Sequence, residues 1–183
     1  MRVVAGQFRG RHLRAPPGMG TRPTADRVRQ ALFAVLGEID GVSVADLYAG
    51  SGALGIEALS RGARHAVFVE SARDALRALR GNLDSLDLAG RCVVLPVSVH
   101  TAKKRLLAWG PYDLVVCDPP WPRLGAAVST LSSLVRMGLL SPDGLLVVEH
   151  PKEQPVELAG ELALADTRHW GGCAISIFRQ CGR

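Results

Sequence analysis

From residue 43 onward, short apolar runs alternate with stretches in which apolar residues recur every three or four positions. The short runs predict strands near 43–47, 65–69, 91–95, 112–117 and 143–149, and the stretches between them predict helices near 53–61, 72–86, 99–108 and 124–138. Strands that alternate with helices in this way form a parallel sheet with helices on both faces. The pattern therefore predicts a doubly wound α/β fold.

The pattern changes after Pro151. Apolar segments at 161–167 and 173–179 are joined by a link at 169–172 that contains two glycines. Two strands joined by a short glycine-rich link form an antiparallel hairpin. With the five strands before it, the hairpin completes a seven-stranded, mostly parallel sheet.

The beginning of the chain reads differently from the rest. Short β-prone pieces at 2–5 and 11–14 are separated by glycines and followed by a Pro-Pro-Gly turn. We expect residues 1–22 to form a small arm or hairpin outside the main sheet. Residues 23–183 then form one domain, because a chain of 183 residues is long enough for one α/β core but not for two.

A helix is expected at 25–36, between the arm and the first strand. Thr24 precedes it as a candidate N-cap, and Gly37 follows it. The face expected to be buried carries Val28, Leu32, Val35 and Leu36. The opposite face carries Arg27, Arg29 and Gln30.

Composition is that of a globular protein, with 48% hydrophobic and 21% charged residues. No apolar run is long enough to span a bilayer as a helix, and the first residues lack the apolar block of a secretory signal. The four cysteines and five histidines show no paired or ligand-like spacing, so neither a disulfide framework nor a metal site is expected. We expect a cytoplasmic protein that does not associate with membranes.

Positive charge is concentrated near the N-terminus. The chain has a net charge of +5, and a single acid, Asp26, is present before residue 31. The arginines in that region are Arg2, Arg9, Arg11, Arg14, Arg22, Arg27 and Arg29. Such a cluster is an electrostatic footprint for nucleic-acid phosphates, although a solvated basic arm without a partner would look the same.

A glycine-rich loop follows the first strand of the alternating region and spans 46–55. Gly50 and Gly52 let the backbone turn sharply beside the start of a helix, where a nucleotide-like ligand can bind. Candidate cofactor-binding residues in the loop are Asp46, Ala49, Gly50, Ser51 and Gly52. A dinucleotide site is disfavoured because Asp46 would oppose a pyrophosphate and the glycine spacing is incomplete. A nucleoside triphosphate is disfavoured because the lysine of a P-loop is absent.

Two further residues follow the next two strands. Glu70 ends the second strand some twenty residues after the glycines, where an acid can accept the hydroxyl groups of a ribose. An exposed acid that caps the following helix is the alternative for Glu70. Ser98 follows the third strand, where an adenine ring could lie against apolar neighbours.

Asp118-Pro119-Pro120-Trp121 follows the apolar strand at 112–117. Proline fixes its own φ and keeps the preceding residue extended, so this turn is stiff. The carboxylate and a backbone carbonyl could face one planar amino group while the Trp121 ring offers a flat surface. Most Pro-Pro pairs at strand ends are only turns. The position of this pair in the sheet has to decide between a structural turn and a binding site for an amino group.

The order of these motifs resembles that of class I S-adenosylmethionine-dependent methyltransferases with a Rossmann-like fold. Asp-Pro-Pro-Trp is similar to the signature of enzymes that methylate exocyclic amines. The segments 3–13 and 21–29, which include Arg-Pro-Thr and Asp-Arg-Val-Arg, resemble the opening of the bacterial RsmD family. That family modifies a guanine of small-subunit (16S) ribosomal RNA, and the resemblance covers nearly the whole chain.

The resemblance implies a methyl donor, S-adenosylmethionine, and an rRNA guanine-N2 methyltransferase that uses no metal and acts as a monomer. Asp118 and Pro119 would orient the amine, and Trp121 would stack on the extruded base. Arg9, Arg11, Arg14, Arg22, Arg27 and Arg29 would hold RNA phosphates. Two alternatives stay open: an adenine-N6 nucleic-acid methyltransferase, and an RNA-binding assembly factor that has this fold without catalysis.

Overall fold

The computed structural model describes residues 1–16, 23–158 and 162–180. Its strands are β1 (Ser43–Leu47), β2 (His65–Val69), β3 (Cys92–Leu95), β4 (Tyr112–Cys117), β5 (Leu140–Pro151), β6 (Leu162–Trp170) and β7 (Cys173–Gln180). They form one sheet in the order β3-β2-β1-β4-β5-β7-β6. β1 to β5 are parallel to one another, and β7 pairs antiparallel with both β5 and β6, which confirms the predicted doubly wound sheet with its C-terminal hairpin.

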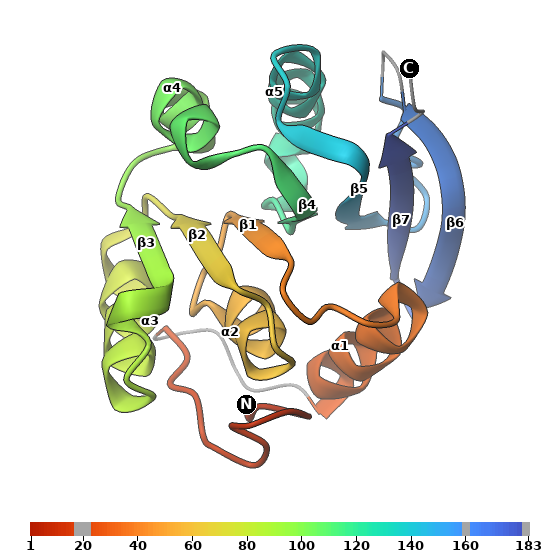
Figure 1. The fold of residues 1–183 in the computed structure, drawn as a ribbon. Coiled ribbons are helices and arrows are strands. Elements are labelled where there is room, and N and C mark those ends of the chain that lie inside the picture. The colour runs from red at the N-terminus through yellow and green to blue at the C-terminus, as the bar shows by residue number, and fades with distance from the viewer. Residues whose placement is uncertain (17–22, 159–161, 181–183) are drawn as a thin grey trace.

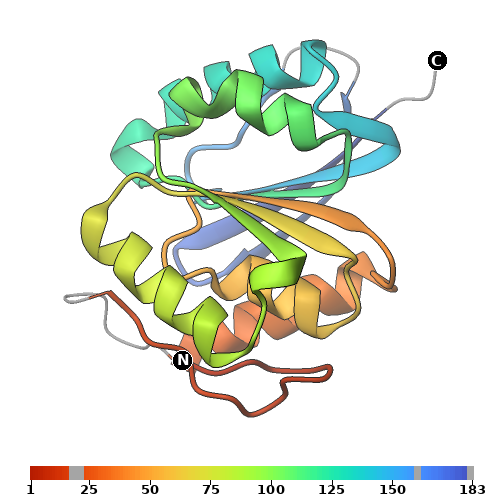
Figure 2. The same ribbon diagram turned by 60° about the vertical axis from the view of Figure 1, so that its left-hand side comes forward.

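The helices are α1 (Pro23–Leu36), α2 (Ala53–Ser60), α3 (Arg73–Ser85), α4 (Val99–Trp109) and α5 (Leu124–Arg136). Figures 1 and 2 show α1, α2 and α3 on one face of the sheet and α4 and α5 on the other. Each face has its own apolar core, one around Phe33, Ile56 and Phe68 and the other around Leu106 and Leu131. Among the described residues, no helix combines the length and apolarity needed to cross a membrane.

The strand order positions the site. β1 lies between β2, which follows it in the chain, and β4, which follows β3 in the chain. Connections leave β1 and β4 in opposite directions along the sheet, and the carboxyl ends of parallel strands diverge at such a switch point to form a crevice. The glycine loop after β1 and the Asp118 turn after β4 lie at this place.

Two elements at the C-terminal side are longer than predicted. β5 begins at Leu140 because the polar segment after it, which reads as a turn, is a bulge within the strand between the pairs Tyr112–Leu140 and Leu114–Leu145. β6 continues to Trp170, so only Gly171 and Gly172 form the hairpin turn. Gly171 has a φ of 60°, which glycine adopts without strain in two-residue hairpins.

The predictions for α1 were partly wrong. The helix begins at Pro23, so Thr24 lies inside it and is not the N-cap. Val35 is 40% exposed, whereas Arg29 and Phe33 are buried. The buried face is therefore shifted by about one residue, because ion pairing allows the Arg29 side chain to be buried.

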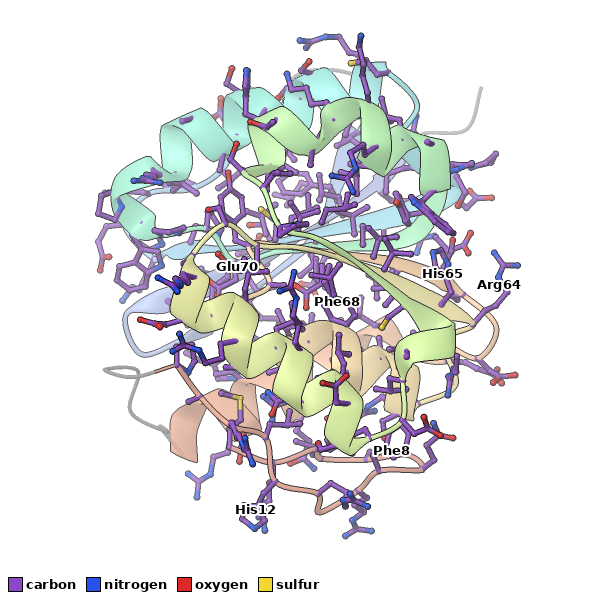
Figure 3. All side chains as sticks on the ribbon, turned by 90° about the vertical axis from the view of Figure 1, so that its left-hand side faces the viewer. Phe8, His12, Arg64, His65, Phe68 and Glu70 are labelled. Carbon is purple, nitrogen blue, oxygen red and sulfur yellow. The ribbon has the colours of Figure 1, made fainter. Side chains whose placement is uncertain are left out.

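The N-terminal arm is fixed to the domain. Arg2 pairs with His12 as an antiparallel bridge, and Val3 and Leu13 join the core beneath α1, α2 and α3. Figure 3 shows the arm running below these helices, with Phe8 toward the end of the sheet where His65 begins β2 and His12 nearer the other end. The arm is therefore a folded edge of the domain rather than a loose appendage.

A buried carboxylate holds the arm in place. Glu57 of α2 has no exposed surface, and its oxygens accept hydrogen bonds from the backbone N–H groups of Val4 (2.7 Å) and Ala5 (3.0 Å). The same carboxylate pairs with Arg61 at 2.8 Å and with Arg29 at 3.6 Å. One acid thus joins the arm, α1 and α2.

Candidate active site

The candidate site lies at the carboxyl edge of the sheet, where the loops after β1, β2, β4 and β5 meet. In the register of the parallel strands, Leu47 pairs with Cys117, and Cys117 pairs with Val148. The backbone N–H of Asp118 donates to the Leu47 carbonyl at 3.4 Å. The Asp118 turn therefore lies directly beside the start of the glycine loop.

The glycine loop is shaped by its backbone. Gly50 and Gly52 have φ values of 57° and 83°, and a Cβ atom on Gly52 would lie 2.4 Å from the Leu79 side chain. The N–H of Gly55 donates to the buried Asp46 carboxylate at 2.8 Å, which fixes the start of α2 to the end of β1. The left-handed conformation therefore favours glycine at both positions, and at Gly52 the close approach of Leu79 from α3 favours it as well.

Glu70 is connected to the glycine loop. Its Oε2 atom accepts from the Gly50 N–H at 2.8 Å, and its Oε1 atom accepts from the N–H groups of Ser71 (2.6 Å) and Ala72 (2.7 Å). Helix capping, the alternative considered for this acid, therefore occurs together with a bond to the loop. A carboxylate has about four acceptor positions, so one remains for a ribose hydroxyl while the three backbone bonds persist.

The other predicted cofactor residues have local structural contacts. Ser98 is the N-cap of α4 and accepts from the Thr101 N–H at 3.2 Å. Ser51 is buried, and its carbonyl accepts from the Asn82 side chain at 2.9 Å. Ala49 donates its N–H to the Val69 carbonyl, which joins the loop to β2. Contact of these residues with a cofactor remains a prediction.

The Asp-Pro-Pro-Trp turn has the properties that recognition of a planar base requires. Pro119 is buried, whereas Asp118 is open to solvent and Trp121 is 45% exposed at the start of a short 3-10 helix, Trp121–Arg123. The N–H of Arg123 donates to the Pro120 carbonyl at 2.7 Å, which fixes the end of the turn. No described side chain makes a hydrogen bond or ion pair to the Asp118 carboxylate, which leaves its oxygens available to an amine.

Burial raises the pKa of three acidic groups at this edge, and neighbouring carboxylates add to the effect for two of them. Burial raises the pKa of Asp46 to about 8, and the nearby carboxylates of Asp118 and Glu70 add to the effect. Part of Asp118 reaches solvent, but protein surrounds most of the residue. The resulting desolvation raises the pKa of Asp118 to about 6. Glu149 has a pKa raised to about 7 by burial and by the Asp118 charge. The edge therefore favours a ligand with positive charge or with several hydrogen-bond donors.

Two residues of this edge were missed in the sequence. Glu149 ends the apolar run of β5 as Glu70 ends that of β2, and this shared pattern is the signal that could have found it. Tyr48 adopts a φ of 60°, which is unusual for a residue other than glycine and often occurs at functional turns. No sequence pattern marks Tyr48, because it depends on the path of the loop.

The arginines predicted to hold RNA separate into two groups. Arg9, Arg11, Arg14 and Arg27 are exposed. Arg29 is not: it is 4% exposed, pairs with Asp26 at 2.8 Å and also bonds to the Arg2 carbonyl, so its prediction as a phosphate ligand was wrong. Arg22 lies outside the described residues.

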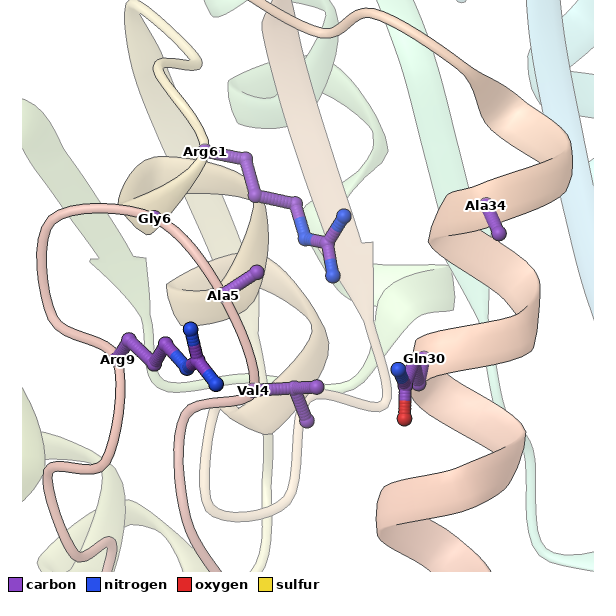
Figure 4. A pocket seen from close by; sticks show the side chains of 7 residues that line it. All are labelled: Val4, Ala5, Gly6, Arg9, Gln30, Ala34 and Arg61. Carbon is purple, nitrogen blue, oxygen red and sulfur yellow. The ribbon is translucent and has the colours of Figure 1, made fainter.

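A hollow of about 550 Å³ lies between the arm, α1 and the end of α2. Its lining, shown in Figure 4, includes Arg9, Gln30 and Arg61. The Arg61 guanidinium packs over the Phe33 ring at 4.9 Å and is paired with Glu57. Because α2 ends where the chain turns back to begin β2, the hollow faces the opposite edge of the sheet from Asp118 and is separate from the candidate site.

Comparison with known proteins gives consistent matches. Residues 1–179 match the family described as Conserved hypothetical protein 95. Bacillus subtilis YlbH is 34% identical over 189 residues, covering all of both chains, and the Escherichia coli protein named ribosomal RNA small subunit methyltransferase D is 38% identical over 154 residues, covering 84% of this chain and 76% of the relative. The solved structure of Escherichia coli yhhF, 33% identical, covers 100% of this chain and 99% of its own with a TM-score of 0.84.

Proposed function

Because the chain belongs to the Conserved hypothetical protein 95 family, which is the RsmD family of rRNA methyltransferases, we propose that it methylates the N2 amine of a guanine in small-subunit rRNA. S-adenosylmethionine is the methyl donor of this reaction. The observation that carries the proposal is the position of the Asp118 turn, joined by its N–H to Leu47 beside the glycine loop. The proposed binding sites for the methyl donor and for the target base are then neighbours at one switch point.

The residues after β1 and β2 fit the donor. The Gly50 loop and Glu70 are already joined, and Glu70 retains acceptor capacity for one ribose hydroxyl. Asp46 lies behind the loop, where burial and neighbouring acids raise its pKa to about 8, and a positive sulfonium group nearby would favour its ionised form. Ala49, Ser51, Gly52 and Ser98 complete the proposed cofactor-binding set at the same edge.

When bound, S-adenosylmethionine would supply an electrophilic methyl group, whose bond to sulfur would break, leaving the electron pair on sulfur, as the bond to the amine nitrogen formed. Asp118 and the Pro119 carbonyl would accept the two hydrogens of the guanine amine and turn its lone pair toward the methyl carbon. Correct orientation of this kind can supply ~7 kcal/mol or more. The proton released from nitrogen passes to Asp118 or to water, and Trp121 offsets part of the cost of extruding the base.

The pKa of Asp118 predicts a pH dependence. Only the ionised carboxylate accepts a hydrogen from the amine without competing as a donor, and its pKa is raised to about 6. We expect kcat/KM to be constant at high pH and to fall as the pH decreases through this value. Glu149→Gln removes a negative neighbour and should move the midpoint to lower pH. A profile that is flat from neutral to acidic pH would contradict the assigned role of Asp118.

RNA contacts give a second prediction that distinguishes two arginines of α1. Arg27 is exposed, so Arg27→Ala should weaken RNA binding and reduce the slope of log affinity against log salt by about 1. Arg29→Ala serves as the matched variant: it removes the same charge from a buried position and should lower thermal stability instead. Filter binding over a range of potassium chloride concentrations checks this. Equal salt slopes in the parent and Arg27→Ala would exclude a phosphate contact.

The proposal includes the setting of the reaction. We infer that the protein acts as a monomer in the cytoplasm on a small subunit or an assembly intermediate, with Arg9, Arg11, Arg14 and Arg27 holding RNA phosphates. Tritiated S-adenosylmethionine incubated with undermodified small subunits, naked rRNA and DNA tests the substrate class. We expect label in RNA and none in DNA. Label in DNA would favour adenine-N6 methylation, and RNA binding without any transfer would favour an assembly factor.

A further inference from the structure

A second carboxylate lies beside the catalytic turn. Asp118 directly follows Cys117 of β4 and Glu149 directly follows Val148 of β5, and these two preceding residues are paired in the parallel register. Cys117 and Val148 both pack on the α4–α5 side, whereas Val116 and Val147 pack on the other side. Alternation of side chains along a strand therefore directs Glu149 to the α1–α3 side, the side on which Asp46 bonds to α2.

The Glu149 carboxylate is close to Asp118 and has no hydrogen-bond or ion-pair partner among the described residues. The two charges influence each other, and both act on the thiol of Cys173 in the neighbouring strand β7. Glu149 is only partly exposed, yet no described side chain or backbone group makes a hydrogen bond or ion pair to its carboxylate. Burying a carboxylate without a hydrogen-bond donor costs free energy. A ligand that supplies the donor offsets part of this cost.

Guanine has a donor in the required place. Its N1–H group is adjacent to the N2 amine on the same edge of the ring, whereas the N1 atom of adenine is an acceptor. An edge with donors on neighbouring atoms matches two neighbouring carboxylates, and an acceptor at N1 would be repelled by one of them. The Asp118 turn by itself recognises only an amino group.

We propose that Glu149 is the specificity-determining residue of the site, accepting the N1–H of the target guanine while Asp118 and Pro119 hold its N2 amine. This inference rests on the proposed function and names the group that selects guanine. A site built to bond a donor discriminates strongly against a base that lacks it, because the site's own polar group is then left unpaired.

The test uses two substrates that differ at N1. The modified guanine is first mapped with the parent protein, and 16S rRNA is then made by splinted ligation with either guanine or 2-aminopurine at that position and assembled into small subunits. 2-Aminopurine keeps the exocyclic amine but has a bare acceptor at N1. The measured quantity is the ratio of kcat/KM for guanine to that for 2-aminopurine in the parent and in Glu149→Gln.

Glu149→Gln should lower this ratio by roughly 10-fold to 100-fold, because the new amide can donate to the N1 atom of 2-aminopurine. The matched control is Glu153→Gln, the same change at an exposed position four residues later, which should leave the ratio unchanged. Thermal unfolding of both variants and the affinity for S-adenosylmethionine should equal those of the parent.

Two failures are distinguishable. If the parent forms no N2-methylguanosine, both the proposed function and this inference fail. If the parent does form it, and Glu149→Gln leaves the ratio unchanged or lowers both rates equally, Glu149 does not select the base and only the inference is overturned. Comparing the ratio of Glu149→Gln with that of the parent also cancels the effect of the missing O6 atom in 2-aminopurine, because both proteins act on the same two substrates.

Discussion

Asp118→Ala should reduce methyl transfer on the order of 10³-fold while the affinity for S-adenosylmethionine stays close to that of the parent. The carboxylate has no bond to any described side chain, so its removal leaves the turn intact. Pro119, Pro120 and the Asp118 N–H bond to Leu47 continue to fix the backbone. What is lost is the acceptor that orients the amine. Single-turnover rates and equilibrium titration with S-adenosylmethionine separate the two effects.

Asp84→Ala provides the control for this variant. Asp84 is an exposed acid on α3, and no described residue forms an ion pair with its side chain. Its replacement should leave both rate and affinity unchanged. If Asp118→Ala turned over at the parental rate, Asp118 would have no catalytic role. If it lost affinity for the donor as well, the turn would belong to the donor site.

Glu57→Ala should cost ~3–5 kcal/mol in the free energy of unfolding, the cost of leaving a buried charge without its partner. Glu57 accepts from two backbone N–H groups of the arm and pairs with Arg29 and Arg61. Its removal leaves the buried Arg29 without one of its two acids and the arm without its anchor. Urea-induced unfolding measures the effect, and limited proteolysis should show cleavage within the first residues.

Glu38→Ala is the corresponding control, because Glu38 is exposed after α1. We expect its free energy of unfolding to lie within about 0.5 kcal/mol of the parent. A loss below about 1 kcal/mol for Glu57→Ala would show that the arm is held by its apolar residues Val3 and Leu13 rather than by the buried carboxylate.

Much of the fold could be predicted because hydrophobic spacing reports directly on strands and helices. β1, β2 and β4 have the predicted bounds, since each is a parallel strand of the sheet's interior whose apolar residues are buried on both faces. The predictions were wrong where the environment of a side chain, rather than its residue type, decides whether the side chain is buried. Arg29 is buried because Asp26 and Glu57 neutralise it, and Glu57 is more than twenty residues away in the chain.

The candidate site was predictable to a similar degree. Asp46 is the penultimate residue of β1, Glu70 and Asp118 directly follow β2 and β4, and parallel strands bring their carboxyl ends to one edge. Glu149 ends the apolar run of β5 as Glu70 ends that of β2, but its place beside Asp118 depends on the pairing of β5 with β4, which is a property of the topology rather than of local sequence. Only the family resemblance indicated guanine as the target base. The structure adds the carboxylate of Glu149, whose replacement tests how the base is selected.

The most direct measurement of the central claim is the identity of the methylated nucleoside. Undermodified small subunits are incubated with the protein and tritiated S-adenosylmethionine, and the rRNA is digested to nucleosides and separated. We predict that the label is found in N2-methylguanosine and that Asp118→Ala yields almost none. Label in N6-methyladenosine, or in any nucleoside other than N2-methylguanosine, would contradict the account.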